Sequence, residues 1–225
     1  MPTASNLTMD SILFENNQRN LVYIPGTSGV NPNHNVRLNR IYAYANGDSS
    51  AIVYSIGHDF VLSNSEFKNN RGLLYLYDNT RIDSTIFENN FGDLTKYGVL
   101  GFEINECKFI DNRCKGKFIN SVKNGTELNH FSVTNSIFKN TDSNGLMYVV
   151  TDSVNISKSE ISGSTNSDIE FDNYRNAILS NCYIHDNEHL HMLYNGYGMK
   201  SSTFTYLKGN TIANNISYAE NGILD

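Results

Sequence analysis

The chain has 225 residues, a formal net charge of −6 and a sequence pI of about 5.5. An acidic chain lacks the basic patch that phosphate binding requires, so we expect no nucleic-acid partner. No run of 18 or more apolar residues occurs, so we expect no membrane insertion by this segment.

The composition favours short strands joined by turns. The sequence has 34 asparagines, 14 tyrosines and 12 phenylalanines, but 3 prolines and no tryptophan. Asparagine is a poor helix former and tolerates the left-handed conformation of tight turns. Because we also find no amphipathic helical stripe, we predict an all-β fold.

One motif recurs along the chain from residue 10 onward. Each copy has an apolar residue, here called the anchor, which is usually followed by paired Asn or Asp residues. Weaker copies place Ile161 and Phe204 in the anchor role, and a degraded copy lies around Ile41. The clear copies are DSILFENN (10–17), NSEFKNN (64–70), DSTIFENN (83–90), ECKFIDN (106–112), NSIFKNT (135–141) and NCYIHDN (181–187).

The residues before each anchor predict two short strands separated by a bend. Positions seven and five before the anchor are mostly apolar, and position two before it is small, as Ile104 and Cys107 illustrate before Phe109. Alternation with period two places each pair on one face, and the step of three between the pairs breaks that alternation. A further strand follows most copies. Such strands are expected at 72–78, 115–122, 144–150, 168–173 and 189–195.

A single copy is too short to bury its own apolar face. Stacked copies would place equivalent residues about 4.8 Å apart and build one continuous core. We therefore predict one domain, residues 1–225, folded as a right-handed single-stranded parallel β-helix of about nine coils. No terminal cap is visible, so we expect a solenoid segment that is uncapped at one or both ends. Its ends would stack on other copies or on neighbouring solenoid segments.

The F-x-x-N elements at 14–17, 67–70, 87–90 and 109–112 resemble the repeat of polymorphic outer-membrane-type and adhesin-like surface proteins. These families share the fold of pectin lyases. The resemblance implies an extracellular or cell-surface location, as part of a larger exported protein. Together with the monotony of the repeat, it favours a structural or adhesive rod that binds glycans or protein partners. Two alternatives stay open, a carbohydrate-active β-helix enzyme and a segment of a viral or phage fibre.

Enzymatic activity is not our first expectation. β-Helix lyases and hydrolases need clustered carboxylates, or carboxylates beside Lys or Arg, on one face. The acidic residues are dispersed along the sequence, and nothing in it brings Lys117 or Arg113 together with them. We therefore expect no catalytic residues and no cofactor.

The densest polar cluster is the segment 185–191. If its apolar residues point inward, His189 and His191 point outward on one face. Asp168 and Glu170 would lie in register one coil earlier, and two histidines above two carboxylates could hold a divalent metal. An ordinary solvated strand face would show the same pattern.

Outward tyrosines predict a ligand-binding surface. In the segment 72–78, Tyr75 and Tyr77 alternate with inward leucines, and Tyr148 occupies a similar position further along. Flat aromatic rings offer a surface on which sugars could stack. Exposed aromatic residues also favour strands for reasons unrelated to binding. Tyr42 or Tyr44 could lie on the same or a nearby face.

Cys107 and Cys182 occupy the small position two residues before the anchor. They lie about three coils apart, about 14 Å at the strand spacing, which is too far for a disulfide. We expect both to be reduced, buried thiols that fill space.

Overall fold

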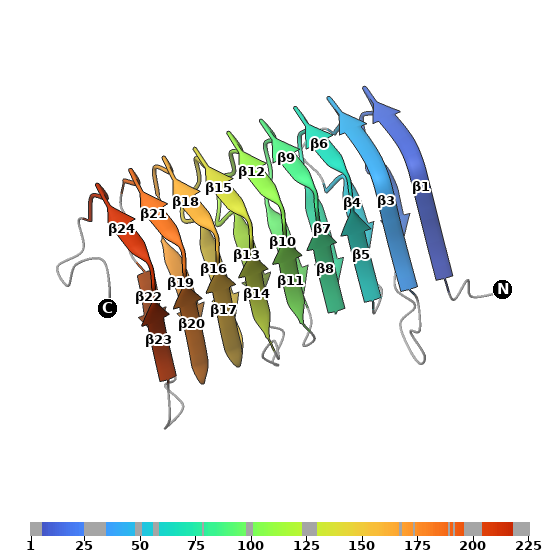
Figure 1. The fold of residues 1–225 in the computed structure, drawn as a ribbon. Helices are drawn as coiled ribbons and strands as arrows, with labels where there is room; N and C mark the ends of the chain where they lie inside the picture. The colour runs from blue at the N-terminus through green and yellow to red at the C-terminus, as the bar shows by residue number, and fades with distance from the viewer. Residues whose placement is uncertain are drawn as a thin grey trace.

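The computed structural model describes residues 6–24, 35–47, 51–55, 59–77, 79–97, 101–122, 130–166, 168–172, 174–188, 190, 192–195 and 204–217. In this part of the chain every regular element is a strand, and every strand pair is parallel. The strands stack along one axis, with β1 and β24 at opposite ends (Figure 1). The chain folds as a right-handed parallel β-helix, which confirms the predicted fold.

The strands form three rows along the axis, called here the first, second and third sheets. The first sheet holds β1 (Asn6–Glu15), β3 (Asn35–Tyr44), β5 (Asp59–Ser63), β8 (Asn79–Asp83), β11 (Phe102–Asn105), β14 (Phe131–Thr134), β17 (Ser153–Ser157), β20 (Asn176–Ser180) and β23 (Phe204–Lys208). The second holds β6 (Glu66–Lys68), β9 (Ile86–Glu88), β12 (Lys108–Ile110), β15 (Ile137–Lys139), β18 (Glu160–Ser162), β21 (Tyr183–His185) and β24 (Thr211–Ala213). The third holds β2 (Val22–Ile24), β4 (Val53–Ser55), β7 (Leu74–Tyr77), β10 (Leu94–Tyr97), β13 (Ile119–Val122), β16 (Met147–Val150), β19 (Ile169–Asp172) and β22 (Met192–Asn195).

The first two coils differ from the later ones because their strands run through the bend. Residues 35–39 of β3 pair with β5 in the first sheet, whereas residues 42–44 pair with β6 in the second. β1 pairs with β3 over the same length. From the third coil onward a break separates the two short strands, as the step of three in the sequence predicts.

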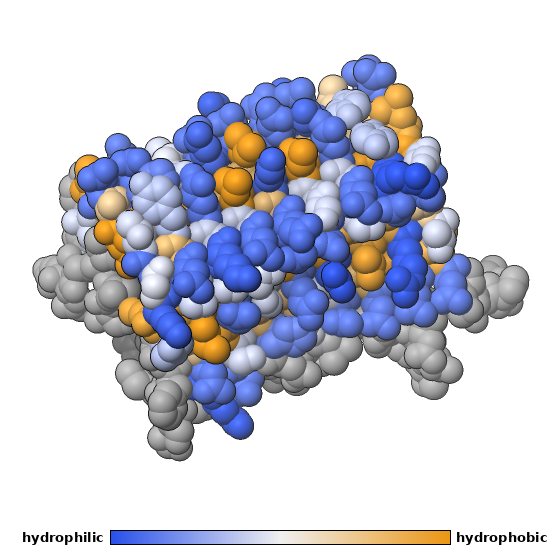
Figure 2. Space-filling model, in the orientation of Figure 1, coloured by the Kyte–Doolittle hydropathy of each residue, from blue (hydrophilic) through white to orange (hydrophobic). Residues whose placement is uncertain are grey.

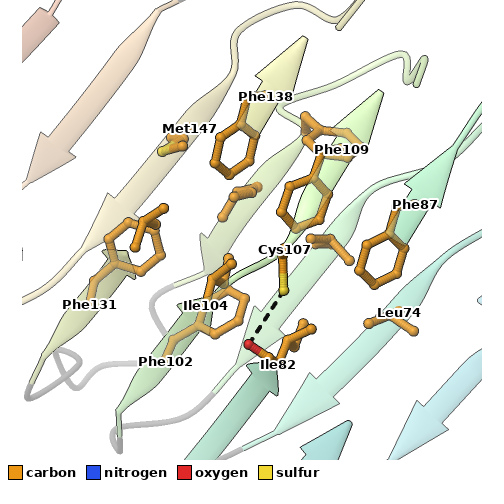
Figure 3. Close-up of a cluster of buried hydrophobic side chains, with 14 of the residues drawn as sticks. Leu74, Ile82, Phe87, Phe102, Ile104, Cys107, Phe109, Phe131, Phe138 and Met147 are labelled. Atoms are coloured by element: carbon orange, nitrogen blue, oxygen red, sulfur yellow. Dashed lines mark hydrogen bonds between the residues drawn. The ribbon is translucent and has the colours of Figure 1, made fainter. Parts of the chain in front are cut away.

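Like side chains stack on one another in the core. Phe67, Phe87, Phe109 and Phe138 pair in turn along the second sheet, and their ring centroids are 5.2, 5.0 and 4.6 Å apart. Figure 3 shows the last three of these rings beside the inward side chains of the first sheet. All four side chains are buried. The anchor column predicted from the repeat is therefore confirmed for these coils.

The degraded copy around Ile41 has Ala43 as its anchor, since Ala43 pairs with Phe14 and Phe67. The predicted anchor Phe204 is wrong. Ile212, not Phe204, occupies the anchor position of the last coil, and Phe204 instead begins β23 in the first sheet. In both coils an asparagine stands three residues after the true anchor, and its hydrogen bonds, rather than the size of the apolar residue, determine the register.

Every coil changes direction at two residues in the left-handed conformation. One lies three residues before the anchor, between the first and second sheets, and the other lies two residues after it. Their φ angles fall between 47° and 65°, a region that asparagine and glycine enter at low cost. The residues are Ser11, Asn16, Arg40, Ala45, Asn64, Asn69, Ser84, Asn89, Glu106, Asp111, Asn135, Asn140, Lys158, Gly163, Asn181, Asp186, Gly209 and Asn214.

The asparagine after the second left-handed residue points inward and forms a hydrogen-bonded ladder. Asn70 Oδ1 accepts hydrogen bonds from the backbone N–H and the Nδ2 of Asn46, at 2.9 and 3.2 Å. Asn70 Nδ2 donates to the Ala43 carbonyl at 2.8 Å and to Asn90 Oδ1 at 3.0 Å. Each amide side chain thus forms hydrogen bonds with backbone groups that have no partner in a sheet because they lie in the turn. The members of this asparagine ladder are Asn17, Asn46, Asn70, Asn90, Asn112, Asn187 and Asn215.

The ladder is interrupted in two coils. Thr141 and Ser164 stand where the other coils have asparagine, and the Thr141 backbone N–H donates to Ser164 Oγ at 3.3 Å. Ser164 in turn donates its backbone N–H to Asn187 Oδ1 at 3.1 Å, where the ladder resumes. The buried Thr141 Oγ1 has no hydrogen-bond partner among the described residues.

A second ladder lines the bend between the first and second sheets. Ser136 Oγ accepts from the Cys107 backbone N–H at 3.1 Å and donates to the Thr134 carbonyl at 2.8 Å. Ser159 repeats this arrangement toward Ser136. The small polar residues before the anchors are therefore needed for hydrogen bonding as well as for their size.

The two ends of the solenoid are described to different extents. At the first coil β1 pairs with β3 on one side, and its inward residues Leu7, Met9, Ile12 and Phe14 are partly buried. At the other end the described residues stop at 217, so residues 218–225 lie outside them.

The ladder predicts unequal effects of two equivalent substitutions. Asn90→Ala removes the acceptor of the Asn70 N–H and the donor to the Phe67 carbonyl. We expect it to lower the free energy of unfolding by about 3 kcal/mol, because buried groups are left without partners. Thr141→Ala, at the same position of another coil, removes a hydroxyl that makes no hydrogen bond, and should cost about 1 kcal/mol or less. Urea unfolding followed by circular dichroism compares them, and equal costs would contradict the assigned role of the ladder.

Candidate functional site

The outer face of the third sheet carries a stack of tyrosines. Tyr23, Tyr54 and Tyr75 occupy equivalent positions of β2, β4 and β7, with ring centroids 5.0 and 4.8 Å apart and planes within 22° of parallel. Tyr77 lies beside Tyr75 at 5.7 Å, tilted by 52°. Tyr148 lies in the same column, but two coils separate it from Tyr75.

This stacking limits what the tyrosines offer a ligand. Tyr54 has a neighbouring ring on each face, and Tyr75 has one on the face toward Tyr54. The stack therefore offers mainly ring edges and hydroxyl groups, rather than open ring faces, to a ligand on this side. Binding at Tyr75, Tyr77 and Tyr148 stays a prediction. Tyr42 and Tyr44 lie in β3, which belongs to the other two sheets.

The predicted metal site is described only in part. His189 and His191 lie outside the described residues. Lys117 Nζ lies 2.6 Å from Glu170 Oε1 and 3.9 Å from Asp168 Oδ2, so a lysine already neutralises these carboxylates. No group of three or more His, Cys, Asp or Glu side chains suited to a metal occurs in the described part of the chain.

Lys117 reaches the two carboxylates by crossing the coil between them. Its side chain passes over Gly145, where a Cβ atom would lie 2.5 Å from Lys117 Cδ and Nζ. Gly145 has a φ of 129°, which side chains rarely adopt. The sequence alone contains no sign of this contact between Lys117 and Glu170.

The three cysteines are free thiols of low reactivity. Cys107 and Cys182 are buried, and Cys114 is half-buried. Burial raises the pKa of the Cys107 and Cys114 thiols to about 12 and also raises the pKa of Cys182. Cys107 Sγ donates to the Asn105 carbonyl at 3.2 Å and contacts the Ile82 carbonyl at 3.5 Å (Figure 3). They are therefore poor candidates for nucleophiles.

A polar groove follows the turns at the end of the second sheet, and we call it the turn groove. It has a volume of about 540 Å³ and brings Glu88, Asp111 and Asp142 close to Lys68 and Arg113. Charged residues that are scattered in the sequence thus converge, contrary to our expectation. The carboxylates are already engaged, since Glu88 pairs with Lys68 at 3.0 Å and Asp111 accepts from Asn140 at 2.9 Å.

A second groove crosses the outer face of the first sheet, and we call it the first-sheet groove. It has a volume of about 550 Å³ and runs across β11, β14, β17, β20 and β23. Its outermost residues pair in one column. From one end to the other the column is Glu103, Ser132, Asn155, Ile178 and Tyr206.

The two ends of the first-sheet groove differ in chemistry. At one end His130 Nε2 lies 3.0 Å from Glu103 Oε1. The His130 ring lies against Gly101, where a Cβ atom would come within 2.0 Å of it, so a side chain at this position would displace the ring. At the other end Ile178 and Tyr206 are 40% and 51% exposed. Hydroxyl and amide side chains separate the polar end from the apolar one.

Sequence reasoning missed the first-sheet groove because of the wrong anchor in the last coil. With Ile212 as the anchor, Tyr206 and Ile178 both fall six residues before an anchor and become neighbours on one outer face. The apolar residues Ile178 and Tyr206, at the same outward position of adjacent coils, were the sequence signal that could have revealed the groove. Figure 2 shows small hydrophobic patches separated by hydrophilic residues on one face of the molecule.

Comparison with known proteins supports the architecture. A family model described as a right handed beta helix region matches residues 121–224. No curated protein and no solved structure matched the chain. Among the described residues, no helix is long and apolar enough to cross a membrane.

The buried cysteines predict slow labelling of the folded protein. At pH 8 a thiol with a pKa of about 12 is ionised in about one molecule in ten thousand. A thiol-reactive dye should therefore label Cys107 and Cys182 slowly in the native protein and rapidly in urea. Cys107→Ser, which copies Ser136 of the next coil, should lower the number of labelled thiols in urea by one. Rapid native labelling of Cys107, or a mass showing a 107–182 disulfide, would refute this.

Proposed function

We propose that this chain is a structural and adhesive rod of an extracellular surface protein, and that its first-sheet groove binds glycans. The observation that carries the proposal is the groove across five coils, with exposed Tyr206 and Ile178 at one end and Glu103 with His130 at the other. An exposed aromatic ring beside hydroxyl, amide and carboxylate groups suits sugars, which have both C–H faces and hydroxyls.

The regular architecture supports a role as a rod. Each coil repeats the same two corners and the same inward positions, so the fold extends along one axis by adding coils. Among the described residues β1 pairs with β3, and its inward residues are only partly buried; both observations support end-to-end stacking on another copy or a neighbouring solenoid segment. We propose these as protein partners of the rod.

A carbohydrate-active enzyme is the second candidate, and the turn groove is the observation that favours it. It places Glu88, Asp111 and Asp142 near Lys68 and Arg113, as lyases and hydrolases of this architecture require. We favour the non-catalytic rod for two reasons. In the turn groove Glu88 is paired with Lys68 and Asp111 accepts a hydrogen bond from Asn140, and Glu103 is the one carboxylate among the residues that line the first-sheet groove. Glycoside hydrolysis commonly uses a pair of carboxylates.

The proposed function predicts that glycan binding depends on Tyr206. Purified protein applied to a glycan array should bind at least one polysaccharide, and Tyr206→Ala should weaken that binding about tenfold through loss of ring contacts. Tyr42→Ala is the matched control, because Tyr42 is 37% exposed but lies in β3, outside the groove. Product analysis of the bound glycan separates a binding protein from an enzyme.

Two results would contradict the proposed function. One is that no glycan on the array is retained. The other is equal binding by Tyr206→Ala and the wild type. Light scattering addresses the fibre alternative, because a fibre segment is expected to trimerise through a side face, whereas end-to-end stacking gives open-ended association.

A further inference from the structure

We infer that the first-sheet groove selects uncharged glycans that lie along the helix axis, and that it discriminates against acidic ones. The inference rests on the proposed function and adds the substrate class. It follows from two properties of the groove, the charge of its lining and the spacing of its side chains.

The lining carries a carboxylate but no lysine or arginine. Glu103 and His130 lie at one end, and the remaining polar residues are Ser132, Ser153, Asn155, Asn176 and Tyr206. The nearby Arg175 is paired with Asp152, with Arg175 Nε 3.1 Å from Asp152 Oδ1. Arg81, which lies outside the lining, is the strand partner of Glu103 in the neighbouring coil, but its Nη2 is engaged by Asp83 Oδ2 at 3.2 Å. A uronate or sulfated sugar would thus meet Glu103 with no lysine or arginine in the lining to offset the repulsion.

The neutral side chains match sugar hydroxyls. Serine hydroxyls and asparagine amides both donate and accept hydrogen bonds, as sugar hydroxyls do. Ser132 and Asn155 follow Glu103 in the column, so a ligand would meet a carboxylate, a hydroxyl and an amide in successive coils. Ile178 and Tyr206 then offer apolar area to the C–H face of a ring.

The spacing of the column favours a glycan over a peptide. Successive coils are about 4.8 Å apart, so the five residues of the column span about 19 Å. An extended peptide presents side chains on one side about every 6.6 Å and would lose register with the coils. A chain of pyranose rings has a repeat close to the coil spacing. The groove also lies on a sheet face, where the strands have no free edge to pair with a peptide.

The test compares neutral polysaccharides with charged versions of themselves. Glucan, mannan, galactan and xylan, and the carboxymethylated derivative of each, are placed in native affinity gels. We expect the wild-type protein to be retarded by at least one neutral polymer, and at least tenfold more weakly by its carboxymethylated derivative. Tyr206→Ala should weaken the retardation by the neutral polymer about tenfold.

Charge variants test whether Glu103 causes the preference for neutral over acidic polymers. Glu103→Lys should raise affinity for the carboxymethylated polymer at least tenfold, and Glu103→Gln, which removes the charge without reversing it, should raise that affinity less. Arg81 occupies the equivalent position one coil earlier, so a long cationic side chain fits there. Glu106→Lys is the matched control. It makes the same charge change in the same coil outside the groove lining, and Lys158 already occupies the equivalent left-handed position of another coil.

The possible outcomes distinguish failure of the inference from failure of the proposed function. If carboxymethylated polymers bind as well as neutral ones and still require Tyr206, the inference fails and the proposed function stands. The inference also fails if Glu106→Lys changes the preference as much as Glu103→Lys. If no polymer retards the protein, the proposed function fails and the inference fails with it.

Discussion

Backbone hydrogen bonding at the corners of the coils is the constraint on which this fold depends. Within the sheets the backbone of each coil forms hydrogen bonds with the next coil. At every corner, N–H and carbonyl groups point away from the neighbouring strand and cannot form these bonds. Leaving such groups buried without partners costs about 1–3 kcal/mol each. The asparagine ladder supplies partners after the second sheet, and Ser, Thr and Cys supply them at the bend. Since the same side chains recur in each coil, the corners hold the coils in register.

The corners also explain how much of the fold the sequence predicts. The paired asparagines marked the turns, and strand alternation placed the inward residues, because both signals are local. The prediction failed where it followed a large apolar residue instead of the turn. Phe204 resembles an anchor in isolation, whereas the Asn210 amide, which accepts from the Cys182 N–H at 2.9 Å, reveals the true register. Asn210 can be recognised as the marker of the register only when the backbone group to which its side chain hydrogen-bonds is known.

In the candidate sites, too, the sequence predicts what depends on local signals and does not predict what depends on contacts between coils. Tyr75 and Tyr77 could be placed on the outer face of one strand, because two residues in one strand share a face. The contact between Lys117 and Glu170 could not be predicted, since 53 residues and an intervening coil separate them. The first-sheet groove needed the correct register in five coils at once, so a single wrong anchor concealed it.

The interruption of the asparagine ladder has a mechanical consequence for a rod. The amides from Asn46 to Asn112 form one continuous chain of side-chain hydrogen bonds, and Asn187 with Asn215 forms another. Between them the coils of Thr141 and Ser164 are joined at this corner by a weaker contact of 3.3 Å. If the rod were pulled along its axis, we expect the coils to separate first at this seam. The coils before it, which include the tyrosine stack, would stay folded under a load that has already opened the seam.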